Sequence, residues 1–301
     1  MDNSIQLSVL MTVYNAELYL NEAVESILNQ SYSDFEFIII NDGSTDSSLS
    51  ILKNYAQLDK RIKLITRENK GIVASRNELL YMASGKYIAI MDSDDISHPQ
   101  RLQKQLAFLS KNEEYYIVGC QDLLIDPEGL AIKTINNKYQ HEEVDAANLR
   151  FDEFQTLNAY MTITKELLNI GGYRNKVIYA EDRDVFLRMA EVGKVSVFPE
   201  VLYSYRQHYT NICVEKRVEI KQSVQTVVQD AYKRRGLTFV RDKDDSCEQD
   251  VVIKDQFRAW AWWSLEAGNT RTALKYTRKL LMRTPFSLSS WQLLLCVMRG
   301  Y

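Results

Sequence analysis

Short apolar runs alternate with amphipathic stretches over the first 110 residues of the chain. The apolar runs are rich in residues that favour strands, and they cover residues 7–13, 35–40, 61–66 and 86–91. The stretches between them carry apolar side chains at helical spacing, and they cover residues 16–30, 45–57 and 71–84. This alternation predicts an α/β fold, a mostly parallel Rossmann-like sheet that helices cover on both faces.

The pattern becomes less regular from about Glu114. We expect a strand at 115–126, a strand and a short helix at 159–173, a helix at 180–193, and a β segment interrupted by Pro199 at 194–208. Beyond Asn211 the strand signals fade and helical stretches follow. The sequence therefore predicts a domain of residues 1–210 and a helical C-terminal region of residues 211–301.

Bulk composition indicates a globular protein without a nucleic-acid partner. Of the 301 residues, 46% are hydrophobic and 26% are charged, and the net charge of −3 argues against nucleic-acid binding. The four cysteines, Cys120, Cys213, Cys247 and Cys296, show no metal-binding or redox spacing. The chain shows neither a signal-peptide pattern nor an apolar run of about 18–20 residues, so we expect a cytoplasmic protein.

Polar segments follow each of the first four predicted strands. They are residues 12–15, 41–46, 67–71 and 92–95. In a parallel sheet of this kind, ligands bind outside the carboxyl ends of the strands. The sequence therefore predicts that chemistry resides in these segments.

Three aspartates stand within four residues at the end of the fourth predicted strand. Residues two apart in a strand face the same side, so Asp92 and Asp94 can point together while Asp95 points away. Paired carboxylates suit Mg²⁺ or Mn²⁺. The alternative is a solvated turn in which Asp95 or Ser97 caps a helix that starts near Pro99. Both interpretations can hold, because capping uses only one acid.

The other strand ends also allow two interpretations. Residues 41–46 form a turn in which Ser44 or Thr45 can cap the next helix. Tyr14, at the end of the first strand, can lie under an aromatic base or can be a half-buried loop aromatic.

Several short motifs then occur in a recognisable order. They are Thr12–Asn15, Asn41–Asp46, Ala74–Asn77, Asp92–Asp95 with Pro99–Arg101, Gly171-Gly172 and Glu181-Asp182. In this order and spacing, residues 5–210 resemble the inverting, metal-dependent glycosyltransferases of family 2, which have the GT-A fold. The resemblance implies a donor-binding half at about 1–110 and an acceptor-binding half at about 111–210. Leu79 and Lys70-Gly71 depart from the pattern, since glycines often stand there.

The resemblance implies a role for each motif. Tyr14 would stack on the nucleobase, Asp42 would accept the uracil imide N–H, and Arg76 would reach the base or the diphosphate. The other donor-binding residues would be Thr12, Asn15, Asp92, Ser93 and Arg206. Asp94 would be the principal ligand of Mn²⁺ or Mg²⁺, with Asp92 and His208 completing the set.

The Glu181-Asp182 pair opens a predicted helix, where acids also favour the helix dipole. The resemblance instead makes Asp182 the general base and Glu181 an acceptor-orienting or structural residue. It implies an inverting hexosyl or hexosaminyl transfer from a UDP-sugar, or a dTDP-sugar, to a glycan or lipid-linked acceptor in polysaccharide synthesis. The alternatives are a haloacid-dehalogenase-type phosphatase, with its nucleophile in residues 91–95, and a non-catalytic nucleotide-sugar-binding scaffold. We find no transferable signal for the acceptor in Asp126–Asn158.

Aromatic and basic residues alternate in the predicted C-terminal helices. The aromatic residues are Trp260, Trp262, Trp263 and Trp291, and the basic ones are Arg271, Lys275, Arg278, Lys279 and Arg283. This pattern is typical of a peripheral contact with the inner membrane face. It also fits a packed helical hairpin with a solvated basic face, or a homodimer surface.

Overall fold

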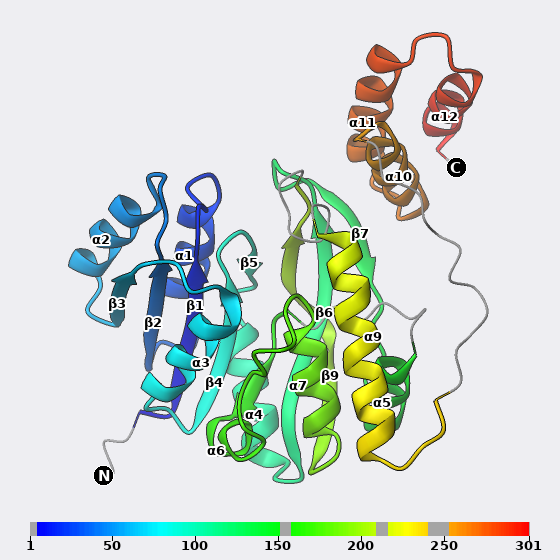
Figure 1. Cartoon of the computed structure of the whole chain (residues 1–301). Coiled ribbons are helices and arrows are strands. Elements are labelled where there is room, and N and C mark those ends of the chain that lie inside the picture. The colour runs from blue at the N-terminus through cyan, green and yellow to red at the C-terminus, as the bar shows by residue number, and fades with distance from the viewer. Residues whose placement is uncertain (1–4, 151–157, 209–215, 240–252, 301) are drawn as a thin grey trace.

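The computed structural model describes residues 5–150, 158–208, 216–239 and 253–300. A nine-stranded sheet runs through the molecule in the order β3-β2-β1-β4-β8-β6-β9-β5, with β7 beside β6 (Figure 1). The strands are β1 Leu7–Val13, β2 Phe35–Asp42, β3 Ile62–Arg67, β4 Tyr87–Asp92, β5 Ile96–Ser97, β6 Tyr115–Ile125, β7 Ala131–Ile135, β8 Met161–Ile163 and β9 Lys194–Arg206. The helices are α1 Leu20–Leu28, α2 Ser48–Leu58, α3 Ile72–Met82, α4 Arg101–Lys111, α5 His141–Leu149, α6 Thr164–Asn169, α7 Glu181–Met189, α9 Arg217–Arg234, α10 Ile253–Glu266, α11 Thr270–Arg283 and α12 Leu288–Arg299.

The α/β fold class is confirmed, but beyond the first four strands the sheet is mixed rather than mostly parallel. Strands β1 to β4 pair in parallel, as the strand–helix alternation predicts. Strand β8 runs antiparallel to both β4 and β6, while β6 and β9 are parallel. The expectation of a mostly parallel sheet is therefore wrong beyond β4. An apolar run marks a strand without showing the direction in which the strand runs.

Helices pack on both faces of the sheet and bury it completely at its centre. In β1, Val9 and Met11 face the core that includes α1, and Leu10 faces the opposite core that includes α3 and α7. Both sets of side chains are almost fully buried. This explains why the first strands read as nearly continuous apolar runs rather than as alternating ones.

Two helices start later than the sequence indicates. Helix α4 begins at Arg101, and Asp95 does not cap it but accepts a hydrogen bond from Arg206 N at 2.8 Å. Ser97 is likewise not its cap, because Ser97 Oγ accepts from Gln30 Nε2. Residues that are distant in the sequence therefore form hydrogen bonds with the side chains that local spacing predicted to be helix caps.

The same correction applies to α2. This helix begins at Ser48, whose backbone N–H donates to Asp46 Oδ1 at 2.9 Å. Ser44 and Thr45 instead contact Asn15, at the end of β1. The segment 41–46 therefore joins two neighbouring strand ends.

The described elements after β9 are helices. Helix α9 packs beside α7, while α10–α12 lie at one end of the molecule beside β7 (Figure 1). Asn269 Nδ2 donates to Ile132 O at 3.0 Å, and Trp260 is fully buried in this contact region. The expected boundary near Asn211, and the cysteines Cys213 and Cys247, lie outside the described residues. Among the helices of the described ranges, none is long and apolar enough to cross a membrane.

Candidate active site

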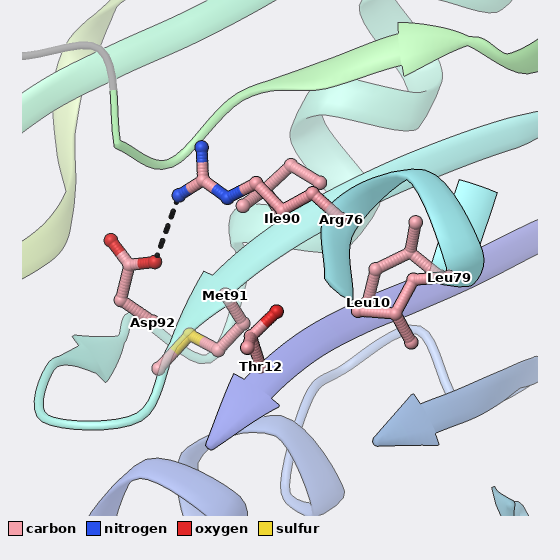
Figure 2. A pocket seen from close by; sticks show the side chains of 7 residues that line it. All are labelled: Leu10, Thr12, Arg76, Leu79, Ile90, Met91 and Asp92. Carbon is pink, nitrogen blue, oxygen red and sulfur yellow. Dashed lines mark hydrogen bonds and ion pairs between the residues drawn. The ribbon is translucent and has the colours of Figure 1, made fainter. Parts of the chain in front are cut away.

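The predicted strand-end segments meet where the order of the sheet reverses. Strand β1 lies between β2 and β4, so the chain winds outward from β1 in both directions, and Thr12 is in register with Asp92. Such a switch point is where open α/β sheets bind ligands. Thr12, Arg76 and Asp92 line a cavity of about 10 Å³ there, space for one water molecule (Figure 2). Among the described residues, no partner is found for the buried Thr12 Oγ1.

One guanidinium joins three carboxylates at this point. Arg76 extends from α3 toward Asp92 at the end of β4, with Nη2 3.3 Å from Asp92 Oδ1 (Figure 2). Arg76 Nη1 lies 3.2 Å from Glu181 Oε1 and also donates to Asp182 Oδ1. Only 6% of the Arg76 side chain is exposed. The structure thus brings the predicted base, at the start of α7, to the aspartate of β4.

The electrostatics of this cluster disfavour charge on the carboxylates. Burial, with the negative charges of Glu181 and Asp92, raises the pKa of Asp182 to about 8 in spite of Arg76. Burial, with Asp94 and Glu181 nearby, raises the pKa of Asp92 to about 6, again against the lowering effect of Arg76. A carboxyl with a raised pKa in a cleft is typical of a proton-transfer group.

Asp94 and His208 also meet. His208 Nε2 lies 2.9 Å from Asp94 Oδ2, although the two residues are 114 positions apart in the sequence. The side chain of Asp94 is partly exposed, and so is that of Asp92 two positions earlier. Asp95 points away from them into the interior, as the strand period predicts, and burial beside Asp94 and Asp92 raises its pKa well above the ordinary value.

Arg206 supports this loop from within. Its Nε donates to Asp94 O at 2.9 Å, its Nη1 to Pro127 O at 3.1 Å and its Nη2 to Glu22 Oε2 at 2.6 Å. The side chain is almost fully buried. The sequence places Arg206 against a phosphate, whereas the described contacts direct its guanidinium at the protein. Its observed role is to hold residues 94–95.

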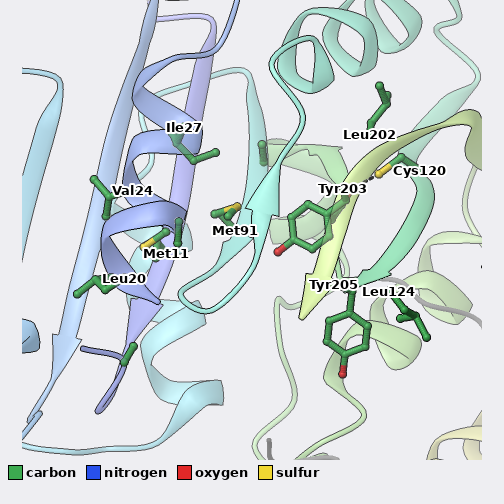
Figure 3. Close-up of a cluster of buried hydrophobic side chains, with 14 of the residues drawn as sticks. Met11, Leu20, Val24, Ile27, Met91, Cys120, Leu124, Leu202, Tyr203 and Tyr205 are labelled. Atoms are coloured by element: carbon green, nitrogen blue, oxygen red, sulfur yellow. Dashed lines mark hydrogen bonds between the residues drawn. The ribbon is translucent and has the colours of Figure 1, made fainter. Parts of the chain in front are cut away.

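Two aromatic residues that the sequence reasoning missed complete the support. The Asp92 backbone N–H donates to the hydroxyl of Tyr203, whose ring lies on β9 near Met91 (Figure 3). The ring of Tyr173 lies 5.6 Å from the Arg76 guanidinium. Nothing in the sequence near these tyrosines identifies them, because both act across long sequence separations.

Asp42, the predicted base-recognition residue, is held by a short loop after β3. Asp42 Oδ1 accepts hydrogen bonds from Lys70 N at 2.9 Å and from Arg67 Nη1, and Oδ2 accepts from Gly71 N at 2.9 Å. Gly71 has a positive φ of 85°, which only glycine adopts readily. The departure at Lys70-Gly71 therefore keeps a glycine where the backbone requires one.

Tyr14 and Asn15 directly follow β1. The side chain of Tyr14 is 52% exposed at the end of β1, so a planar ligand can reach its ring. Asn15 has a φ of 51°, and its Oδ1 accepts from Thr45 N at 2.8 Å. Ser93 lies in the turn after β4, half-buried.

The Gly171-Gly172 turn follows α6, and the next residue is hydrogen-bonded to α3. Asn77 accepts a hydrogen bond from Tyr173 N at 2.9 Å and donates to Tyr173 O at 2.8 Å. Gly172 has a φ of 62°, and a Cβ there would lie 2.6 Å from Asn77 Oδ1. Tyr179 also has a positive φ, of 69°, just before Asp182. Tyr179 is thus the non-glycine residue with an unusual backbone conformation in the segment that leads into α7.

The described side chains contain no preformed metal centre. No group of three or more His, Cys, Asp or Glu residues within the described ranges has the geometry of one. The pairs Asp92–Arg76 and Asp94–His208 satisfy these carboxylates within the protein instead.

The sequence of this chain is similar to a known protein family and to individual relatives. Residues 8–168 match the model of glycosyl transferase family 2. The putative glycosyltransferase EpsE of Bacillus subtilis is 36% identical over 250 residues, which cover 80% of this chain and 80% of EpsE.

Solved structures confirm the fold. The mannosyltransferase PcManGT of Pyrobaculum calidifontis, in complex with GDP-Man and Mn²⁺, superposes with a TM-score of 0.60 at 16% identity, covering 98% of this chain and 85% of that one. Residues 1–349 of S. aureus TarS, in complex with UDP, superpose with a TM-score of 0.55 at 19% identity, covering 98% of this chain and 89% of that one. The expectation of a GT-A fold with C-terminal helices is confirmed.

Proposed function

The chain belongs to glycosyltransferase family 2, and we therefore propose that it transfers a sugar, with inversion, from a uridine diphosphate sugar to a saccharide or lipid-linked saccharide. One observation carries the proposal. Asp182 and Asp92, 90 residues apart, meet on the two sides of the Arg76 guanidinium at the switch point of the sheet. In an inverting transfer the base approaches one face of the donor sugar and the diphosphate leaves from the other, so the two carboxylates would lie on opposite sides of that sugar.

The donor would lie over the ends of β1, β2 and β4. Tyr14 would stack on the uracil, and Asp42 Oδ2, with one described donor at present, would accept the imide N–H. Thr12, Asn15, Ser93 and Asp92 would line the ribose and diphosphate. A carboxylate at this position favours uracil or thymine over cytosine, which lacks the donor. Thymine offers the same imide N–H, so a dTDP-sugar is the alternative donor.

The residues after β4 fit a divalent cation. The carboxylates of Asp92 and Asp94 are partly exposed hard donors, and the imidazole of His208 already lies beside Asp94. Mg²⁺ or Mn²⁺ held by these residues would neutralise charge on the leaving diphosphate. Arg206, through Asp94 O and the backbone of residue 206, would keep the ligands in place.

Asp182 would act as the general base. The acceptor oxygen bonds to the anomeric carbon as its proton passes to the Asp182 carboxylate, and the bond from that carbon to the diphosphate oxygen breaks. Attack from the face opposite the diphosphate inverts the configuration. Arg76 now holds Asp182, so a bound diphosphate would compete for the guanidinium and release the carboxylate. Glu181 would then orient the acceptor.

Family membership removes the phosphatase alternative, whereas the scaffold alternative requires a direct test. A thermal-shift panel would compare UDP-glucose, UDP-N-acetylglucosamine, dTDP-glucose and GDP-mannose with and without Mn²⁺. At about 100 times Kd a ligand adds about 2.7 kcal/mol of stability, and the proposal expects this gain for UDP-sugars with Mn²⁺ only. An enzyme also releases UDP slowly by hydrolysis of the donor, which a scaffold does not do.

Asp94→Asn should abolish the gain that depends on Mn²⁺, and Asp34→Asn, at an exposed loop position, is the matched control. Stabilisation by UDP-sugars that is independent of metal and unchanged in Asp94→Asn would contradict the metal assignment. Stabilisation without any UDP release would favour the scaffold.

A further inference from the structure

Helix α12 is apolar on two opposite faces. Leu293 and Val297 are buried against the neighbouring helices, as an amphipathic helix requires. The opposite face presents a second apolar stripe at i, i+3, i+7 and i+10, formed by Leu288, Trp291, Leu295 and Met298. At 100° per residue, these four side chains fall within an arc of about 80°. A helix that needed only to pack on α11 would carry polar residues there.

The end of α11 and the turn before α12 add two more exposed apolar side chains. Met282 and Phe286 are also exposed, and with the four residues above they form what we call the α12 patch, whose members are between 50% and 97% exposed. Trp291 Nε1 donates to Pro285 O at 2.8 Å, which holds the indole ring beside the turn. Contiguous exposure of six large apolar side chains marks an interaction surface.

The charge around the α12 patch identifies the partner. Residues 256–300 contain seven Lys or Arg and one Glu, although the whole chain carries a net charge of −3. Two of the seven, Lys275 and Lys279, form ion pairs with acids outside this range. Arg278, Arg283 and Arg299 are exposed on α11 and α12, beside Met282 and Met298. A second copy of this chain would bring two such positive surfaces together, which disfavours a symmetric dimer.

We propose that the α12 patch inserts into the interface of an anionic lipid bilayer. Apolar side chains with a tryptophan would enter the headgroup boundary, and the flanking arginines would contact lipid phosphates. The proposal goes beyond sugar transfer and does not depend on it.

The structure also relates such a surface to the candidate active site. Asp126, fully buried, accepts hydrogen bonds from Lys275 Nζ and from Tyr276 Oη, the latter at 2.9 Å, both on α11. The next residue, Pro127, accepts from Arg206 Nη1, and Arg206 holds Asp94. Docking through α12 would therefore set the orientation of the site relative to the bilayer.

Vesicle flotation of the full chain tests the proposal. The probes are vesicles of phosphatidylcholine alone and vesicles with half phosphatidylglycerol. We expect binding to the anionic vesicles only. Trp291→Ser with Leu295→Ser should reduce the partition coefficient at least tenfold, and Arg278→Gln with Arg299→Gln should reduce it about 30-fold, since each basic residue near the surface contributes about 1 kcal/mol.

The matched control is Leu58→Ser with Leu237→Ser, which removes two exposed apolar side chains elsewhere. An equal loss of binding in this control would overturn the proposal, as would failure of wild-type protein to float with anionic vesicles. Light scattering of the same variants measures whether the α12 patch forms a dimer interface instead. A dimer that Trp291→Ser with Leu295→Ser dissociates would show that a second copy covers the patch. The arginine variant keeps the test valid if the serine variant fails to fold.

Discussion

Replacing Arg76 with Met removes a cation that contacts three carboxylates. Arg76 contacts Asp92 at 3.3 Å, Glu181 at 3.2 Å, and Asp182, while methionine keeps much of the aliphatic packing. Removing one partner of a buried ion pair costs about 3–5 kcal/mol. We take about 3 kcal/mol, because part of Asp92 is in solvent. For a chain of this size this corresponds to a fall in Tm of about 6–12 °C.

The effect should depend on pH in a defined direction. The pKa of Asp182 is about 8 and that of Asp92 about 6, so the folded protein holds protons that the unfolded chain has released, and stability falls as pH rises through this window. Arg76 lowers both pKa values, so its loss makes the fall steeper. The difference in Tm between wild type and Arg76→Met should therefore be larger at pH 8 than at pH 6.

Thermal unfolding followed by circular dichroism at pH 6 and pH 8 measures both quantities. Lys216→Met, which removes an exposed ion pair with Glu219, is the control and should change Tm by no more than about 2–4 °C. Adding Asp182→Asn to Arg76→Met should recover part of the loss. A change in Tm for Arg76→Met that matches the control, or that is equal at both pH values, would refute the electrostatic reasoning.

Three further predictions address the site. Asp182→Asn should lower kcat by about 10²–10⁴-fold while leaving UDP binding unchanged. The kcat/KM of the wild type should rise with pH to a plateau above about pH 8, because the Asp182 carboxyl loses its proton there. A full rate in the variant, or a pH profile that is flat, would contradict this role. Gly172→Ala should lower Tm more than Gly171→Ala. A Cβ on residue 172 would lie 2.6 Å from Asn77 Oδ1, whereas a Cβ on residue 171 would meet no described atom within 4 Å. Equal shifts in Tm would contradict this. His208→Ala should raise the Mn²⁺ concentration for half-maximal activity at least tenfold; an unchanged requirement removes it from the metal set.

Local pattern was sufficient to predict much of the fold. The first strand is observed at Leu7–Val13 as predicted, and the other early strands lie within one or two residues of the expected bounds. Polar segments after these strands also led to Asp92 and Asp94, whereas Asp182 came from the family resemblance. The inferences about the strands and the residues after them depend on spacing within a few residues, which is set by strand and helix geometry.

The sequence pattern did not predict which residues pair across long sequence separations. The caps expected from Ser44, Thr45 and Asp95 were wrong, because Asn15 and Arg206 bind these groups from other strands. Arg206 was expected at a phosphate, whereas its described contacts are with the protein, at Asp94 O and Glu22 Oε2. Local spacing lists the polar groups that need partners without showing which distant group satisfies them.

The sequence by itself determined that this chain builds strand–helix units, that carboxylates gather at the ends of its strands, and that its C-terminal helices are both apolar and basic. The tertiary structure alone decided that Arg76 joins Asp92 to Asp182, that β8 runs antiparallel, and that α12 turns one of two apolar faces to solvent. Periodicity reports the local path of the backbone. Ion-pair partners, strand direction and the choice of buried face are settled by packing between segments far apart in the chain, where burial and desolvation act.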